Sequence, residues 1–200
     1  MFILIFLFLH QNKFNMRLLL SISCMLFSLA AFSQLNLNVE FLSSIQYDSD
    51  GNDVWGYVAR DSSEYAIFGT FNGVSIVNVT DPSNPVEVDF IDQQGSIWRD
   101  MKTWGEYAYV VADEGGTTDG ILVIDMSDLP NSITWENINP TVNGSTINRC
   151  HNIFIDEFGY AYLAACENVN NDGIVIYDVF STPGKPEFVS TMAPVYSHDV

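Results

Sequence analysis

Three pairs of adjacent polar residues open apolar segments and could form a ligand site. The pairs are Arg99-Asp100, His151-Asn152 and His198-Asp199, and Asp53 stands near the corresponding place of an earlier segment. Asp53, Asp100, Asn152 and Asp199 would suit a hard cation such as calcium, which takes oxygen ligands. The two histidines together with Asp100 and Asp199 would suit zinc or another transition metal. A divalent cation is therefore the cofactor that these residue types suggest.

The direction of each side chain limits which residues can meet. The segments are predicted strands, and adjacent residues of a strand point to opposite faces of the sheet. Either Arg99, His151 and His198 point one way, or Asp100, Asn152 and Asp199 do. A structural interpretation stays open beside the metal hypothesis: the pairs could bond neighbouring elements and fix their packing, because buried polar groups need partners whatever their function.

A cassette of four β-rich segments recurs along the chain and must position these pairs. The pairs and Asp53 lie in its first segment, and a Tyr-Ala segment begins the second at Glu64, Glu106 and Gly159. Runs rich in Val and Ile follow Gly73, Gly120 and Gly173, and each ends in turn residues. The fourth segment lies near Glu40, Glu87, Glu136 and Glu187, which are spaced about 50 residues apart.

Four short strands in each unit of about 50 residues predict an all-β fold, a β-propeller of four-stranded blades. About three and a half blades are present, because SHDV at the end of the chain opens a fourth unit. The segment VEFLSS from Val39 should complete the last blade by circular closure. The first strand of a blade is innermost, so the polar pairs should gather around the central channel. We also expect the chain to be part of a longer protein, since propellers have at least about four blades.

Residues 1–33 have the features of an export signal. They contain no acidic residue, and Met16-Arg17 precede an apolar stretch that ends with small residues before Gln34. We expect Met16 to be the true start, cleavage after Ser33, and residues 34–200 to form the partial propeller. Neither apolar run of the leader reaches the ~18 residues of a membrane-spanning helix. The prediction is a secreted or cell-surface protein without a transmembrane span in its mature part.

The charge of the chain excludes one class of partner. The net charge is −18, and removal of the leader takes away Lys13 and Arg17 but no acidic residue. Such a surface repels phosphate backbones, so nucleic acid is not an expected partner. An extracellular protein, a glycan or a small ligand remains possible.

Two cysteines of the mature part bracket a predicted hairpin. Cys150 and Cys166 each stand eight residues from Phe158, near the predicted turn at Glu157–Gly159. Antiparallel pairing about Phe158 would place them opposite each other, within the range of a disulfide. Export makes the bond plausible. A register slip of one residue would instead leave two buried thiols, and the sequence leaves both possibilities open.

The segments NDVWGY, WRDMKTWGEYAYVVADE, GILVIDMSDL, CHNIFIDEFGYAYLA and YSHDV resemble the choice-of-anchor B family, whose members carry the LVIVD repeat. The resemblance covers residues 39–200. It implies an exported bacterial surface propeller attached through a C-terminal anchor, a segment that we expect to lie outside this sequence. The resemblance implies no particular activity.

Three functions follow from these observations. The leading hypothesis is a non-enzymatic surface propeller that binds a partner, glycan or ion through its loops or channel mouth. The second is a metal-dependent hydrolase that uses the histidines and aspartates, and the third is a structural spacer. No nucleophile motif can be placed, so no catalytic residue is assigned.

Overall fold

The computed structural model describes residues 38–114, 119–142, 144–167, 173–192 and 195–200. The predicted leader, residues 1–33, lies outside the described residues. The chain divides into two compact units, Met1–Phe41 and Leu42–Val200. The fold described below is that of the second unit.

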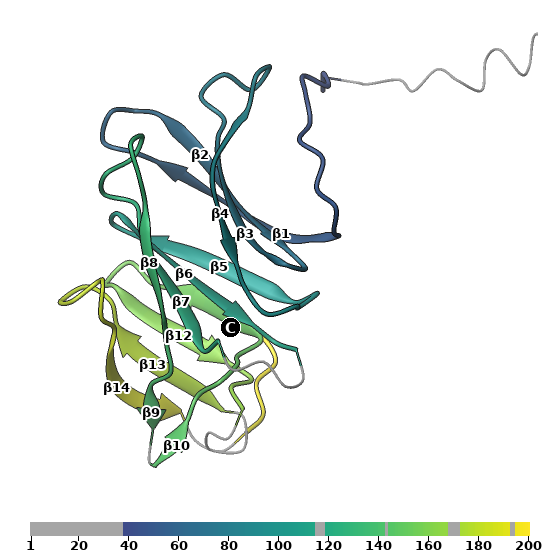
Figure 1. Cartoon of the computed structure of the whole chain (residues 1–200). Coiled ribbons are helices and arrows are strands. Elements are labelled where there is room, and N and C mark those ends of the chain that lie inside the picture. Colours follow the sequence, from purple (N-terminus) through teal and green to yellow (C-terminus); the bar gives the residue numbers. More distant parts are fainter. Residues whose placement is uncertain (1–37, 115–118, 143, 168–172, 193–194) are drawn as a thin grey trace, which may run out of the picture. The chain divides into compact units, whose positions relative to one another are not determined.

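Twelve strands of the second unit form three four-stranded antiparallel sheets, each with its strands in chain order (Figure 1). We call these sheets the first, second and third blades. The first blade comprises β1 (Gly51–Val58), β2 (Glu64–Thr70), β3 (Gly73–Asn78) and β4 (Val86–Asp92). The second comprises β5 (Arg99–Trp104), β6 (Tyr107–Ala112), β7 (Ile121–Asp125) and β8 (Thr134–Ile138). The third comprises β11 (Asn152–Ile155), β12 (Tyr160–Ala164), β13 (Ile174–Asp178) and β14 (Glu187–Met192).

A small hairpin, β9 (Thr141–Val142) and β10 (Ser145–Thr146), lies between the second and third blades in the sequence. The described residues contain no helix. An all-β fold of propeller blades is therefore confirmed. Among the described residues no helix is long and apolar enough to cross a membrane.

The middle strands of the second blade are apolar along almost their whole length because the first and third blades cover both of their faces. Four of the five residues of β7, Ile121–Asp125, are buried. A strand buried on both faces has a continuous rather than an alternating apolar pattern. The outermost strand of the same blade, β8, is largely exposed.

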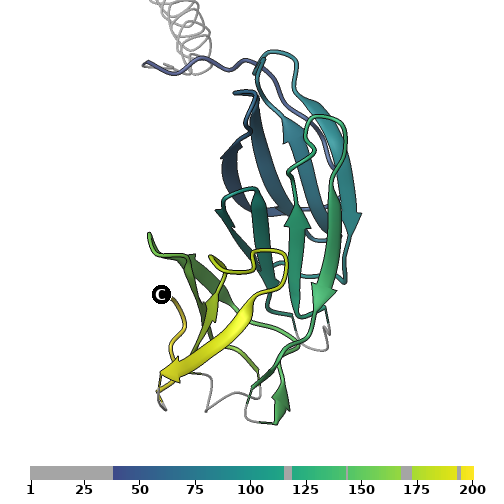
Figure 2. The ribbon, with the colours of Figure 1, turned by 90° about the vertical axis from the view of Figure 1, so that its left-hand side faces the viewer.

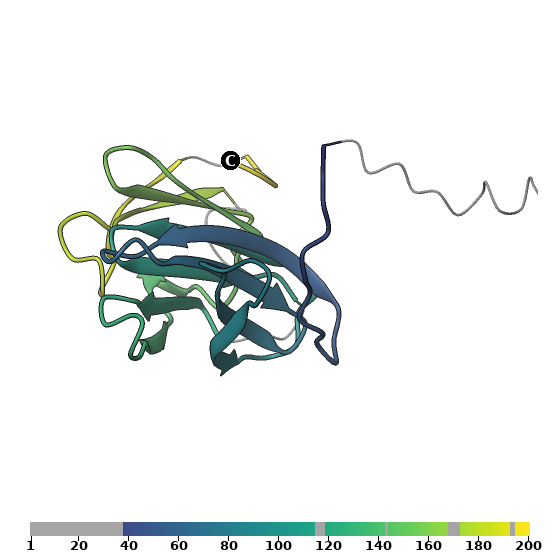
Figure 3. The ribbon, with the colours of Figure 1, turned by 90° about the horizontal axis from the view of Figure 1, so that it is seen from above.

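Strand β6 shows how the blades share their cores. Ala108 and Val110 pack into the core between the first and second blades. Tyr109 and Val111 pack into the core between the second and third. Because successive side chains of a strand point to opposite faces, one strand supplies both cores. The three sheets follow one another in Figure 2, and the first overlies the second in Figure 3.

The innermost strands β1, β5 and β11 lie side by side, with β5 in contact with both of the others. The blade order therefore brings the predicted polar pairs to one part of the molecule. This is the arrangement that the cassette predicted.

Two predicted segments form no strand. Residues 38–50 are not in a strand. The last blade, which VEFLSS should complete, is not among the three described blades, so circular closure stays a prediction. Within the second unit this stretch is held by side chains, since the Ser43 hydroxyl donates to the Pro82 carbonyl at 2.6 Å. Residues 195–200, which open the fourth cassette, also form no strand. A strand needs a ladder of hydrogen bonds to a neighbour. Among the described residues neither stretch has one, although the Asp50 carbonyl accepts a single bond from the Phe71 N–H.

Candidate cation site at the inner strands

The strand register places Asp100 and Asn152 at the same position of successive blades. Asp100 lies opposite Val111 and Asn152 lies opposite Ala164 in the first hairpin of each blade. Asp53 lies near this position in the first blade, inside an irregularity of β1 between Gly51 and Val54. The repeat thus puts a short polar side chain on each of the three innermost strands.

Asp100 joins the second blade to the third. Its Oδ2 accepts hydrogen bonds from Asn152 Nδ2 at 2.5 Å and from the Ile153 backbone N–H at 2.8 Å. Its Oδ1 accepts from the Met101 N–H at 2.8 Å and from Lys102 Nζ at 2.5 Å. These donors use the acceptor capacity of the carboxylate, which has about four lone-pair sites. Asp100 therefore serves blade stacking, and we leave it out of the cation site.

The same contact recurs one blade further along. Asn152 Oδ1 accepts a hydrogen bond from the Val200 backbone N–H at 3.0 Å. Val200 follows Asp199 as Ile153 follows Asn152, so the two bonds are equivalent in the repeat. The structural interpretation of the polar pairs thus describes Asp100 and Asn152 well.

Asp53 lies beside Asp100 at the start of this series. Burial raises the pKa of Asp53 above its usual value, and a hydrogen bond with the Asp100 carboxyl raises it further. The Val54 backbone N–H and the Lys102 ammonium oppose this rise. Asp199, the fourth oxygen-bearing residue, lies beside the histidines, with Oδ2 2.9 Å from His198 Nδ1.

Arg99 fastens the second blade to the first. Its side chain is buried, and Nε donates to the Thr70 carbonyl at 2.9 Å. Nη2 donates to the carbonyls of Phe71 and Gln94. Burial lowers the pKa of Arg99, an effect that the charge of Asp119 opposes. With its donors used in this way, Arg99 is a stacking residue and does not join the histidines.

His151 is oriented by a carboxylate from the neighbouring blade. Its Nδ1 lies 2.9 Å from Asp113 Oδ2. Asp113 Oδ1 accepts a hydrogen bond from Arg149, whose Nε lies 3.4 Å from Glu167. An ionised carboxylate only accepts hydrogen bonds, so the hydrogen of a neutral His151 ring belongs on Nδ1. The lone pair of Nε2 is then available to a ligand.

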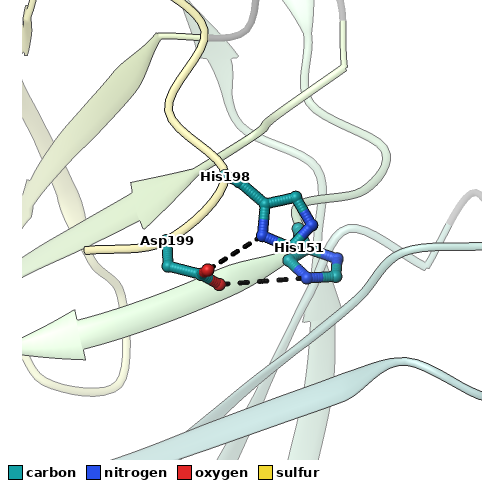
Figure 4. A group of neighbouring side chains, drawn as sticks. All are labelled: His151, His198 and Asp199. Atoms are coloured by element: carbon teal, nitrogen blue, oxygen red, sulfur yellow. Dashed lines mark hydrogen bonds and ion pairs between the residues drawn. The ribbon is translucent and has the colours of Figure 1, made fainter.

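His151, His198 and Asp199 form a compact cluster (Figure 4). Their potential ligand atoms all lie within 4.8 Å of one another. His198 Nδ1 is 2.9 Å from Asp199 Oδ2, and His151 Nε2 is 3.9 Å from Asp199 Oδ1. Ligand atoms around a tetrahedral zinc ion lie about 3.4 Å apart, given bonds of 2.0–2.2 Å. The two distances lie on either side of this value, and the remaining separation is within 4.8 Å.

Asp199 points to the histidines, although strict alternation would turn it away from His198. The alternation prediction is wrong here because residues 195–200 are not a strand, and the period of two applies only to extended pleated chain. Strand alternation does separate His151, at the start of the third blade, from its neighbour Asn152. The site thus combines members of both predicted sets.

Two exposed aromatic rings stand beside the cluster. The Trp98 ring centroid is 6.1 Å from that of His151, and the Tyr196 centroid is 6.3 Å from that of His198. Both rings are more than half exposed. The cluster also faces solvent, since the Asp199 side chain is 66% exposed while that of His151 is 17% exposed. A cation held here would keep an open side toward solvent.

A disulfide joins Cys150 and Cys166 next to this site. The sulfurs are 2.01 Å apart and the Cα atoms 4.0 Å apart. The hairpin has the register about Phe158 that the sequence predicted, with Asn152 opposite Ala164 and Ile155 opposite Ala161. The bond lies directly before His151 in the chain and helps to fix where β11 begins.

Sequence reasoning missed Asp113 and Arg149. By register Asp113 corresponds to Phe71 of the first blade and Cys166 of the third. The repeat therefore gave no signal for a carboxylate at this position. Only the arrangement of the blades brings Asp113 to His151.

The LVIVD repeat family matches the chain at residues 62–92 and 97–139. The first match spans β2 to β4, and the second spans the whole second blade. These matches support a repeat-containing β-propeller. His151, His198 and Asp199 lie outside the matched residues. No protein of curated function and no solved structure matches the chain significantly.

Proposed function

We propose that this chain is an exported, cell-surface propeller of the choice-of-anchor B type that works as a non-enzymatic binding module. Its site takes a divalent transition-metal cation through His151, His198 and Asp199. The export signal of residues 1–33 and the paired cysteines support the extracellular setting, where disulfides persist.

One observation carries the binding proposal: two imidazoles and a carboxylate offer ligand atoms within 4.8 Å of one another. Two nitrogen donors and one oxygen donor favour zinc or a similar metal. Calcium prefers six to eight oxygen ligands. The oxygens of Asp100 are already occupied by hydrogen-bond donors. We therefore choose the transition-metal alternative over calcium.

The exposed side of the cluster supports a role in binding a partner. Three protein ligands leave a fourth position on a tetrahedral ion, which water or a donor group of a partner can fill. Trp98 and Tyr196 beside it offer apolar ring surface for contact. The same open position favours a metal-dependent hydrolase as the second candidate.

Isothermal titration of zinc into the metal-free chain tests the proposal. We expect one site in the wild type, and loss of that binding in His198→Ala and Asp199→Ala. Glu187→Gln, which changes an exposed carboxylate of β14 outside the cluster, should bind as the wild type does. Equal binding by wild type and His198→Ala would contradict the site. Zinc-dependent cleavage of ester or phosphoester substrates that is lost in His198→Ala would favour the hydrolase.

A further inference from the structure

We infer that Asp113 is the positioning residue of the cation site and that a bound cation ties the second blade to the third through it. This inference rests on the proposed function. It adds a residue that neither the repeat nor the metal-ligand pattern identifies, and it gives that residue a role distinct from ligation.

The backbone holds Asp113 rigidly at the end of the second blade. The residue directly follows β6, and its N–H donates to the Trp98 carbonyl at 2.9 Å. From there the carboxylate reaches across to the third blade, where it meets His151 Nδ1 and Arg149 Nη1. Each carboxylate oxygen thus has a different partner, which fixes the plane and the direction of the group.

The contact between the Asp113 carboxylate and His151 Nδ1 determines which ring nitrogen of His151 can bind a metal. It keeps the ring hydrogen on Nδ1, turns the ring, and leaves Nε2 to the Asp199 side of the cluster. Metal-binding histidines commonly donate their other ring N–H to a carboxylate or carbonyl. Such a partner makes the ligating nitrogen more basic, and its removal lowers the metal affinity by about 10- to 100-fold.

Blade stacking alone does not require a carboxylate at this position. The corresponding residue of the first blade is Phe71, and the first and second blades share an apolar core without a carboxylate there. The second and third blades already share a large apolar core. Asp113 therefore differs from the residues at the same position of the other blades because it offers a carboxylate oxygen to His151 Nδ1.

Arg149 makes the substitution Asp113→Asn informative. The guanidinium has only donors, so the oxygen of the replacing amide should face Arg149. The NH2 of that amide would then face His151 Nδ1 and donate to it. The ring hydrogen would move to Nε2, which removes the lone pair needed by the metal. Replacement of the orienting aspartate by asparagine acts in this way in the Ser-His-Asp triad.

Nitrogen-15 NMR of the histidine rings in the metal-free full chain, followed by zinc titration, tests the inference. In the wild type we expect the hydrogen on His151 Nδ1, and in Asp113→Asn on Nε2, with zinc affinity about 10- to 100-fold lower. The matched control is Glu167→Gln, which removes the other acidic neighbour of Arg149 and should change neither the ring hydrogen nor the affinity. A merely structural role would lower the melting temperature without moving the ring hydrogen.

Two results would overturn the inference: an Nε2 hydrogen on His151 in the metal-free wild type, or wild-type zinc affinity in Asp113→Asn. A different result separates the inference from the proposed function. If the ring hydrogen moves as expected but the wild type binds no zinc, the proposed function fails, while control of the His151 ring by Asp113 is supported.

Discussion

Asp100 Oδ2 lies 2.5 Å from the amide nitrogen of Asn152, the residue at the same position one blade further along. The equivalent acceptor on the third blade, Asn152 Oδ1, bonds the backbone of Val200. One position of the repeat therefore links successive innermost strands by hydrogen bonds. The adjacent position varies, with an arginine in the second blade and a histidine in the third. His151 and His198 of the cation site occupy that adjacent position, whereas Asp199 corresponds to Asp100 and Asn152.

Loss of the Asp100 carboxylate should destabilise the protein strongly. Asp100→Ala removes the acceptor of four donors, among them the Ile153 N–H and the Lys102 ammonium. The side chain is only 14% exposed, so water replaces these bonds poorly. We expect a free energy of unfolding lower by about 2–4 kcal/mol, measured by urea denaturation.

Glu187→Ala, at an exposed position of the third blade, is the control for Asp100→Ala. It should change the free energy of unfolding by less than about 0.5 kcal/mol. Equal stability of Asp100→Ala and the wild type would show that these hydrogen bonds do not hold the blades together.

Asp53→Asn should stabilise the protein near neutral pH. An amide at this position carries no charge and would remove the repulsion between two neighbouring carboxylates. We expect a gain of about 0.5–1 kcal/mol, reduced by partial exposure of the site, and a melting temperature roughly 2 °C higher.

The gain from Asp53→Asn should depend on pH in a defined direction. The folded-state pKa of Asp53 is raised above the usual value of 3.8, so the folded wild type holds this proton to higher pH than the unfolded chain does. Its free energy of unfolding therefore falls as pH rises through the raised pKa. The advantage of Asp53→Asn should shrink near pH 4 and grow toward pH 7 in thermal melts. Asp89→Asn, an exposed position of β4, is the control, and a gain that grows toward acid pH would refute the argument.

The disulfide should be detectable in protein secreted under oxidising conditions and should matter for stability. Mass spectrometry with and without reductant should show the gain of two hydrogens, assigned to Cys150 and Cys166. The double variant Cys150→Ser and Cys166→Ser should lose about 3 kcal/mol, the value for a loop of about 15 residues. Two free thiols in protein secreted under oxidising conditions would contradict the bond.

The strands could be predicted from sequence because the same four segments recur in the same order in each unit of about 50 residues. Glu64–Thr70, the first Tyr-Ala segment, is β2 at its predicted position. The segment at Val39 has the same composition as later outer strands but forms none. Composition describes what a strand can be, whereas pairing depends on a neighbour that the local sequence does not specify.

The candidate site could be predicted only in part, because it depends on contacts between blades. His151 and His198 were found from their type and their place in the repeat. Asp199 was assigned to the opposite face because alternation assumes a strand. Asp113 gave no signal at all, since its partner His151 is 38 residues away and belongs to another blade.

Zinc should stabilise the folded chain against heat, and removal of the metal should reverse the effect. A ligand at 100 times its dissociation constant adds about 2.7 kcal/mol to the free energy of unfolding. For a chain of this size the melting temperature should rise by roughly 5–10 °C. Differential scanning calorimetry with zinc, and then with excess EDTA, measures both steps.

The variant His198→Ala and calcium as a second metal distinguish binding at this site from general binding of cations to the protein surface. The His198 side chain is 55% exposed, so His198→Ala should leave the metal-free melting temperature nearly unchanged while removing the zinc shift. Calcium at the same concentration should give little shift, because two of the three donors are imidazole nitrogens. An equal shift with calcium, or a zinc shift that survives in His198→Ala, would mean that the cation binds to the acidic surface elsewhere.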